Sequence, residues 1–158
     1  MKQPKPKIDL EKLVKMARKI VANGSKPSKV KEAYWLSAER MTGSYPESTE
    51  RSGKWLVFVK IKDVNKVWAK IKEATENGKL GERSKVSTGK QNPNAGDLDT
   101  KVICVYTYDW ADGGDVHRIR EELRKLGITQ KIPYKADSDT TSGKYRVAGD
   151  KNISKYYE

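Results

Sequence analysis

Two lysines, Lys54 and Lys85, stand in short segments whose apolar and β-branched composition is typical of β-strands. Lys54 precedes Trp55, and Lys85 precedes Val86, so each lysine adjoins a residue that would fix its backbone. A lysine that projects from a sheet into a concave surface loses part of its hydration, which lowers its pKa. Such an amine binds phosphate or acts as a general base. The alternative, two surface lysines among the 25 of the chain, stays open on the pattern alone.

The tryptophans divide into one predicted core residue and three candidates for ligand contact. Trp68 follows the apolar face of a predicted helix, which indicates a core position. Trp35, Trp55 and Trp110 lie within predicted strands or at their ends, where an indole stacks on a nucleobase.

A later cluster adds phenols and cations that either complete such a site or form a polar edge strand: Tyr134, Lys135, Lys144, Tyr145 and Arg146. We predict one anion site formed by Lys54, Lys85, Lys135 and Arg146. Tyr134, Trp35, Trp55 or Trp110 would then lie beside it.

Signatures of metal and nucleophile chemistry are weak. His117 is the only histidine, which argues against histidine-rich zinc sites. Asp109, Asp112 and Asp115 are spaced like cation ligands, but the segment lacks the closing carboxylate of a calcium loop, so we interpret them as caps and turns. Cys104 is the only cysteine and lies in an apolar run, which predicts a small buried residue and argues for a reducing compartment. We expect no metal and no cofactor.

The formal net charge of +12 favours a polyanionic ligand or partner, although a basic, solubilising surface also explains it. Lysine outnumbers arginine 25 to 8, which favours general attraction over bidentate readout. No apolar run approaches the roughly 18 residues that span a bilayer, so we expect a soluble, cytoplasmic protein that does not bind membranes. The sequence does not indicate an oligomeric state.

The hydrophobic pattern predicts helices and strands in an order without strict β-α-β alternation. We expect helices over 9–24, 63–76 and 114–126, and strands over 33–41, 54–61, 82–88, 101–108, 130–135 and 144–147. We interpret 1–8 as a disordered basic tail and 9–158 as a single α+β domain. The predicted fold is a curved, mostly antiparallel sheet with helices on its convex face and a cationic groove on the other.

Several segments resemble a small family, that of the basophilic leukaemia-expressed protein. The resemblance covers roughly 33–146 and is carried by Ser52 to Val59, Gly78 to Gly81, Lys85 to Ser87, Val102 to Thr107 and the helix with Arg118 and Arg124. It implies the fold of the cap-binding translation initiation factor, a curved antiparallel sheet backed by helices.

Members of this family are often labelled phosphothreonine lyases, because the sheet resembles that of bacterial effectors that eliminate phosphate from phosphothreonine. The resemblance implies that Lys54 and Lys85 match the effector lysines, with Lys85 as the base. The histidine that serves as general acid there is replaced by Leu56. The resemblance thus implies a phosphate pocket that has lost its acid. β-Elimination needs both a base and an acid, so this loss argues against lyase activity.

We therefore expect a module that binds a phosphorylated small molecule, a nucleotide or RNA in a cationic groove rimmed by tryptophan. A phosphothreonine-lyase-like enzyme that uses Lys85 and Lys54 is the alternative. A second alternative is a protein-interaction domain with an incidental basic surface.

Overall fold

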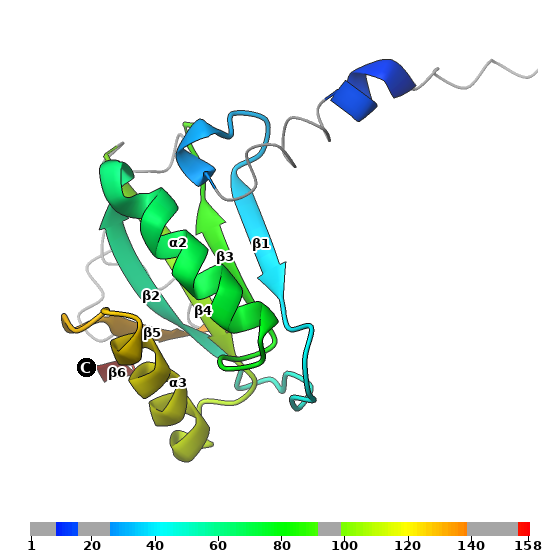
Figure 1. The fold of residues 1–158 in the computed structure, drawn as a ribbon. Coiled ribbons are helices and arrows are strands. Elements are labelled where there is room, and N and C mark those ends of the chain that lie inside the picture. The colour runs from blue at the N-terminus through cyan, green and yellow to red at the C-terminus, as the bar shows by residue number, and fades with distance from the viewer. Residues whose placement is uncertain (1–8, 16–25, 92–98, 139–154) are drawn as a thin grey trace, which may run out of the picture.

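A computed structural model of the protein describes residues 9–15, 26–91, 99–138 and 155–158 (Figure 1). Helical structure is present over 10–15, in the 3-10 helix η1 (Pro27–Lys29), in α2 (Ile61–Glu76) and in α3 (Gly113–Lys125). The strands are β1 (Trp35–Glu39), β2 (Gly53–Lys60), β3 (Arg83–Ser87), β4 (Thr100–Thr107), β5 (Pro133–Ala136) and β6 (Tyr156–Tyr157).

The six strands form one curved, antiparallel sheet in the order β1-β3-β4-β2-β5-β6. The central pair is β2 and β4, which are in register from Gly53 opposite Thr107 to Lys60 opposite Thr100. β5 pairs with only the first three residues of β2, Gly53 to Trp55. The predicted α+β class with an antiparallel sheet is confirmed.

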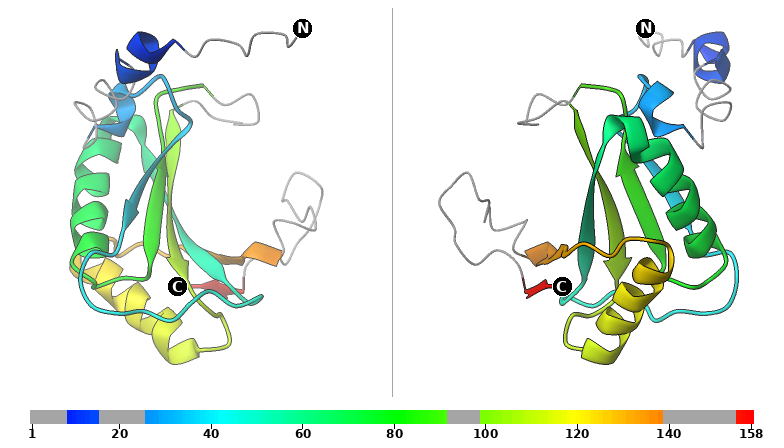
Figure 2. Two further views of the ribbon diagram at one scale, coloured as in Figure 1. Left: turned by 90° about the vertical axis from the view of Figure 1, so that its right-hand side faces the viewer. Right: turned by 60° about the vertical axis from the view of Figure 1, so that its left-hand side comes forward.

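Helices α2 and α3 lie on the same face of the sheet (Figure 2). Trp68 and Ile71 of α2 and Ile119 of α3 are fully buried, as are the sheet residues beneath them. The core thus lies between the helices and one face of the sheet, and the prediction that Trp68 is a core residue is confirmed. We call the other face, which neither α2 nor α3 covers, the open face.

Local signals explain where the two helices begin and end. Asp112 caps α3, because its carboxylate accepts a hydrogen bond from the Asp115 backbone N–H at 3.1 Å. The preceding helix, predicted from residue 63, begins earlier: α2 starts at Ile61, directly after β2, with Lys60 at the N-cap, and Asp63 lies in its first turn. There its charge still favours the helix dipole. Gly78 and Gly127 adopt positive φ just beyond the helix ends, a conformation that commonly terminates helices.

Two predicted elements extend beyond the described residues. The first predicted helix is present over 10–15, where Leu10, Leu13 and Val14 are exposed, and the remainder lies outside the description. The strand predicted over 144–147 lies outside it entirely. β6, only two residues long, was not predicted. Among the described residues, no helix combines the length and apolar character needed to cross a membrane.

Candidate ligand-binding face

Strand alternation decides which side chains reach the open face. In β2, Trp55 and Val57 are buried beneath the helices, so Lys54 and Leu56 point the other way. The same alternation in the neighbouring strands brings these side chains to the open face: Trp35 from β1, Arg83 and Lys85 from β3, and Cys104 and Tyr106 from β4.

Cross-strand pairing gathers the polar members of this set. Lys54 lies directly opposite Tyr106, and Leu56 lies opposite Cys104. On the other side of β4, Cys104 also lies opposite Lys85. Because directly opposed residues share a face, the two predicted lysines lie on the same face, two strands apart, with β4 between them.

Cations stand over aromatic rings across this region. Lys85 Nζ lies 4.0 Å from the centroid of the Trp35 ring, and Arg83 Cζ lies 4.1 Å from that of Tyr106. Lys54 Nζ and Lys85 Nζ lie 5.6 and 5.9 Å from the Tyr106 ring. These distances are those of cation–π contacts. We call the five residues Trp35, Lys54, Arg83, Lys85 and Tyr106 the open-face cluster.

The three cations of the cluster differ in their partners. Lys54 Nζ donates to Asp137 Oδ1 at 2.5 Å, in an ion pair. Glu39 lies across from Arg83 in the strand register. Within the described ranges, however, neither Arg83 nor Lys85 makes an ion pair or a side-chain hydrogen bond. Two cations are thus held by aromatic rings alone and retain their capacity to bind an anion.

Burial dominates the electrostatics of this face. It lowers the pKa of the Lys85 ammonium, and the positive charges of Lys54 and Arg83 lower it further. Burial also raises the pKa of the Cys104 thiol to about 11 and raises the pKa of the Tyr106 phenol. Cys104 and Tyr106 are therefore neutral at pH 7, and the charge of the cluster is positive. A bound anion would offset the mutual repulsion of the cations.

Lys135 belongs to the same face. It lies opposite Lys54 in the pairing of β2 with β5 and is 9% exposed. The structure thus brings three of the four predicted cations, Lys54, Lys85 and Lys135, onto one face. The fourth, Arg146, lies outside the described residues, as does Tyr145.

Trp55 and Tyr134 occupy the opposite face, which corrects their prediction as ligand contacts. Both are fully buried, and their ring centroids lie 5.3 Å apart in an edge-on arrangement. Trp55 Nε1 donates to the Val116 carbonyl of α3 at 3.0 Å, and the Tyr134 hydroxyl hydrogen-bonds Thr107 at 2.7 Å. Each side chain is therefore part of the core beneath the helices.

Trp110, the third candidate, lies beyond the end of β4 and is half-buried against the core. Lys155 Nζ stands 4.1 Å above its ring, and the Tyr156 hydroxyl donates to its carbonyl at 3.0 Å. It makes no contact with the open-face cluster among the interactions of the described residues. Of the three candidates, Trp35 alone joins the cluster.

Sequence reasoning missed Arg83, Tyr106 and Asp137. Arg83 is two residues from Lys85, so strand alternation places the two on one face and would have found it. Tyr106 and Asp137 meet Lys54 only through the pairing of β2 with β4 and through the turn that follows β5. The sequence carried no signal for either contact.

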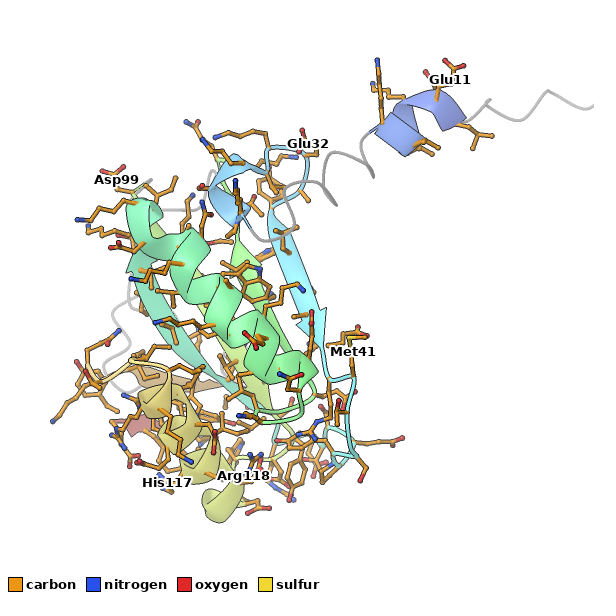
Figure 3. The ribbon with its side chains drawn as sticks, in the orientation of Figure 1. Glu11, Glu32, Met41, Asp99, His117 and Arg118 are labelled. Carbon is orange, nitrogen blue, oxygen red and sulfur yellow. The ribbon has the colours of Figure 1, made fainter. Side chains whose placement is uncertain are left out.

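The residues that would supply an acid for elimination are arranged unfavourably. Leu56, at the position where the resemblance expects a histidine, lies on the open face opposite Cys104. His117 lies on α3, which covers the other face (Figure 3), and its Nδ1 is 2.9 Å from a carboxylate oxygen of Glu158. The only histidine is therefore separated from the cluster by the sheet.

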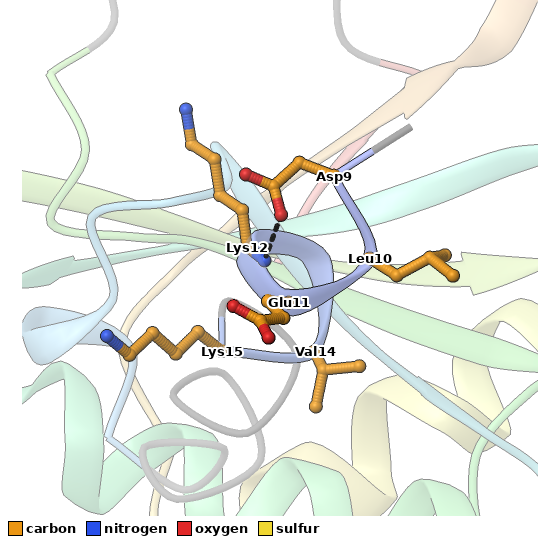
Figure 4. Close-up of a pocket in the computed structure, with 6 residues that line it drawn as sticks. All are labelled: Asp9, Leu10, Glu11, Lys12, Val14 and Lys15. Atoms are coloured by element: carbon orange, nitrogen blue, oxygen red, sulfur yellow. Dashed lines mark hydrogen bonds between the residues drawn. The ribbon is translucent and has the colours of Figure 1, made fainter. Parts of the chain in front are cut away.

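A pocket of about 600 Å³ lies elsewhere, along the helical residues 10–15 (Figure 4). Asp9, Leu10, Glu11, Lys12, Val14 and Lys15 line it. Asp9 Oδ1 accepts a hydrogen bond from the Lys12 backbone N–H, which is a helix cap. The described lining residues include no aromatic ring and balance acid with base, so this part of the pocket does not match the predicted anion site.

The model of the family described as basophilic leukemia-expressed protein Bles03 matches residues 38–141. This chain belongs to the Bles03 family. The matched range contains every strand of the sheet except β1, most of which precedes it, and β6. It thus includes four of the five residues of the open-face cluster.

Solved structures with a similar fold include two of schistosome eIF4E. One, complexed with m7GpppA and 4E-BP, matches with a TM-score of 0.63 and 13% identity over 99% of this chain and 92% of that chain. The other, complexed with m7GpppG and 4E-BP, matches with a TM-score of 0.51 and 15% identity over 69% of this chain and 59% of that chain. The predicted likeness to the cap-binding fold is confirmed. At these identities the likeness is one of fold.

Proposed function

We propose that the open face binds a phosphorylated ligand that carries an aromatic ring, and that a nucleotide or a nucleotide of an RNA is this ligand. The observation that carries the proposal is the pair of cations, Lys85 and Arg83, each held over an aromatic ring with no acidic partner among the described residues. Phosphate would bind the cations, and a base would stack on an exposed ring.

The two cations suit different parts of this task. The Arg83 guanidinium offers a planar fork of donors that matches two phosphate oxygens. Lys85 adds a point charge; burial lowers the pKa of its ammonium, and a bound phosphate would raise that pKa again. Charge-assisted bonds of this kind contribute about 1.5–3 kcal/mol each.

Trp35 is the platform for the base in this proposal. Its ring is 36% exposed, and it borders Lys85 at one edge of the sheet. Stacking of a base on an aromatic side chain is worth about 1–3 kcal/mol. The related fold in eIF4E, crystallised with m7GpppA and with m7GpppG, supports a nucleotide as the class of ligand.

A lyase remains the alternative because one observation favours it: burial lowers the pKa of Lys85, the direction that a general base needs, and Lys85 lies on the same face as Lys54. An acid would also be needed, and Leu56 stands where the resemblance expects one. Loss of a general acid typically costs about 10²–10⁴ in rate. Binding of a phosphorylated ligand therefore accounts for more residues of the open-face cluster than β-elimination does.

Thermal shift and calorimetry with defined probes test the proposal. The probes are GTP, a methylated cap dinucleotide, inorganic tripolyphosphate and a phosphothreonine peptide. A probe present at 100 times its Kd adds roughly 2.7 kcal/mol to the free energy of unfolding. We expect Lys85→Ala to weaken GTP and tripolyphosphate by about tenfold or more. Trp35→Ala should weaken the binding of GTP by about five- to a hundredfold and leave the binding of tripolyphosphate unchanged.

Lys155→Ala is the matched control, because Lys155 covers Trp110 with nearly the same geometry as Lys85 over Trp35. It should leave GTP affinity unchanged. A loss of GTP affinity in Lys155→Ala, with no loss in Lys85→Ala, would place the ligand at Trp110 and refute the open-face site. Release of inorganic phosphate from the phosphothreonine peptide, abolished by Lys85→Ala, would favour the lyase.

A further inference from the structure

A second surface, separate from the open-face cluster, lies along the side of β2 that no described strand covers beyond Trp55. β5 pairs with β2 only from Gly53 to Trp55. In the described part of the chain, residues 56–59 therefore have a strand partner only on the β4 side. A free strand edge presents unpaired backbone N–H and C=O groups, which is a template for another strand.

A pocket of about 420 Å³ lies along this edge. Its lining contains both Phe58 and Val59, whose side chains point to opposite faces because they are consecutive in a strand. Apart from Lys60, the remaining lining residues belong to α2 or to the segment after α3, so the pocket lies beside this edge of β2, between the sheet, α2 and the end of α3. Its volume lies within the range of natural ligand pockets.

The pocket lining combines apolar residues with a basic rim. Val67 of α2 and Leu126 and Ile128 beyond α3 supply the apolar part, together with Phe58, which is 51% exposed. Among the described lining residues, three lysines stand against a single carboxylate: Lys60, Lys66 and Lys70 against Asp63. An exposed phenyl ring bordered by lysines fits an apolar side chain flanked by acidic groups.

We propose that this surface, the β2-edge pocket, binds an acidic, extended segment of another protein, which adds a strand to the edge of β2 and inserts one apolar side chain against Phe58. Charge selects this occupant: a second copy of the chain, with a net charge of +12 and the same lysine rim, would be repelled. Strand addition takes affinity from the backbone and specificity from alternate side-chain pockets.

The test uses a fluorescein-labelled peptide that alternates glutamate with valine around one phenylalanine, measured by fluorescence anisotropy with the full chain. We expect saturable binding of this peptide. A control peptide in which lysine replaces each glutamate should not bind. Phe58→Ala should weaken it at least about fivefold, and Lys66→Glu about three- to tenfold. Both side chains are exposed, so the fold should tolerate these changes.

Matched controls separate this site from general charge and from the open face. Lys62→Glu makes the same charge change on an exposed residue of α2 outside the pocket lining and should leave affinity within about twofold. Lys85→Ala should also have no effect. Equal losses from Lys62→Glu and Lys66→Glu would show non-specific attraction and overturn the proposal.

The mode of binding is tested with the same peptide methylated at alternate backbone nitrogens, which removes its capacity to extend the sheet. Loss of binding supports strand addition, and retained binding overturns it. A dimer in light scattering that Phe58→Ala abolishes would also overturn the proposal, because the surface would then join copies of this chain.

Discussion

Replacement of Trp55 by phenylalanine tests the division of the sheet into a core face and an open face. Trp55 is fully buried, its indole N–H donates to the Val116 carbonyl at 3.0 Å, and its ring packs against Tyr134. Loss of that hydrogen bond costs about 1 kcal/mol. The smaller ring also loses apolar burial and leaves a void, for about 1–2 kcal/mol. We expect a total destabilisation of about 2–3 kcal/mol.

Trp35→Phe is the matched control, since Trp35 is 36% exposed on the open face, and it should change stability by less than about 0.5 kcal/mol. Urea unfolding followed by circular dichroism measures both variants without relying on tryptophan emission. GTP affinity should fall more in Trp35→Phe than in Trp55→Phe. Equal destabilisation by the two variants, or a loss of less than about 0.5 kcal/mol for Trp55→Phe, would refute the assigned faces.

Three further predictions concern buried polar groups. Arg120, fully buried, donates to the carbonyls of Ile128, Gln130 and Glu158, so Arg120→Met should destabilise the fold by about 3 kcal/mol or more in urea unfolding; a loss of less than 1 kcal/mol would contradict these contacts. The hydrogen bond from Arg51 holds the pKa of Asp109 at about 2, below its unfolded value of about 3.9. This stabilisation is present above about pH 4 and is lost as the pH falls toward 2, so Asp109→Asn should flatten the stability profile over that range. Burial raises the pKa of Cys104 to about 11, and iodoacetamide at pH 8 should modify the folded protein about a hundredfold more slowly than the urea-unfolded one.

The strands and helices were predictable because their hydrophobic periods are clear, and the resemblance supplied the curved sheet. The assignment of faces was available too, since Lys54 and Trp55 are neighbours in one strand and alternation sends them to opposite sides. The same rule separates Tyr134 from Lys135. Assigning all four residues to a single site overlooked this constraint.

Other parts of the site depend on pairing that no local pattern encodes. Tyr106 joins Lys54 because β2 and β4 are neighbours in one particular register, and a shift of one residue would turn Tyr106 away. Asp137 reaches Lys54 only because β5 ends beside the start of β2. Such contacts depend on tertiary structure, as does the free edge of β2.

The most direct test of the open-face proposal is the response of the four tryptophan indole N–H signals in a nitrogen-15 NMR spectrum to added GTP. Tryptophan-to-phenylalanine variants assign the signals. If the open face binds GTP, the Trp35 signal shifts with saturation, while those of Trp55 and Trp68, both buried between the helices and the sheet, stay in place. Lys85→Ala should raise the GTP concentration that half-saturates this shift by about tenfold or more. A saturating shift of Trp110 with an unmoved Trp35 would contradict the account.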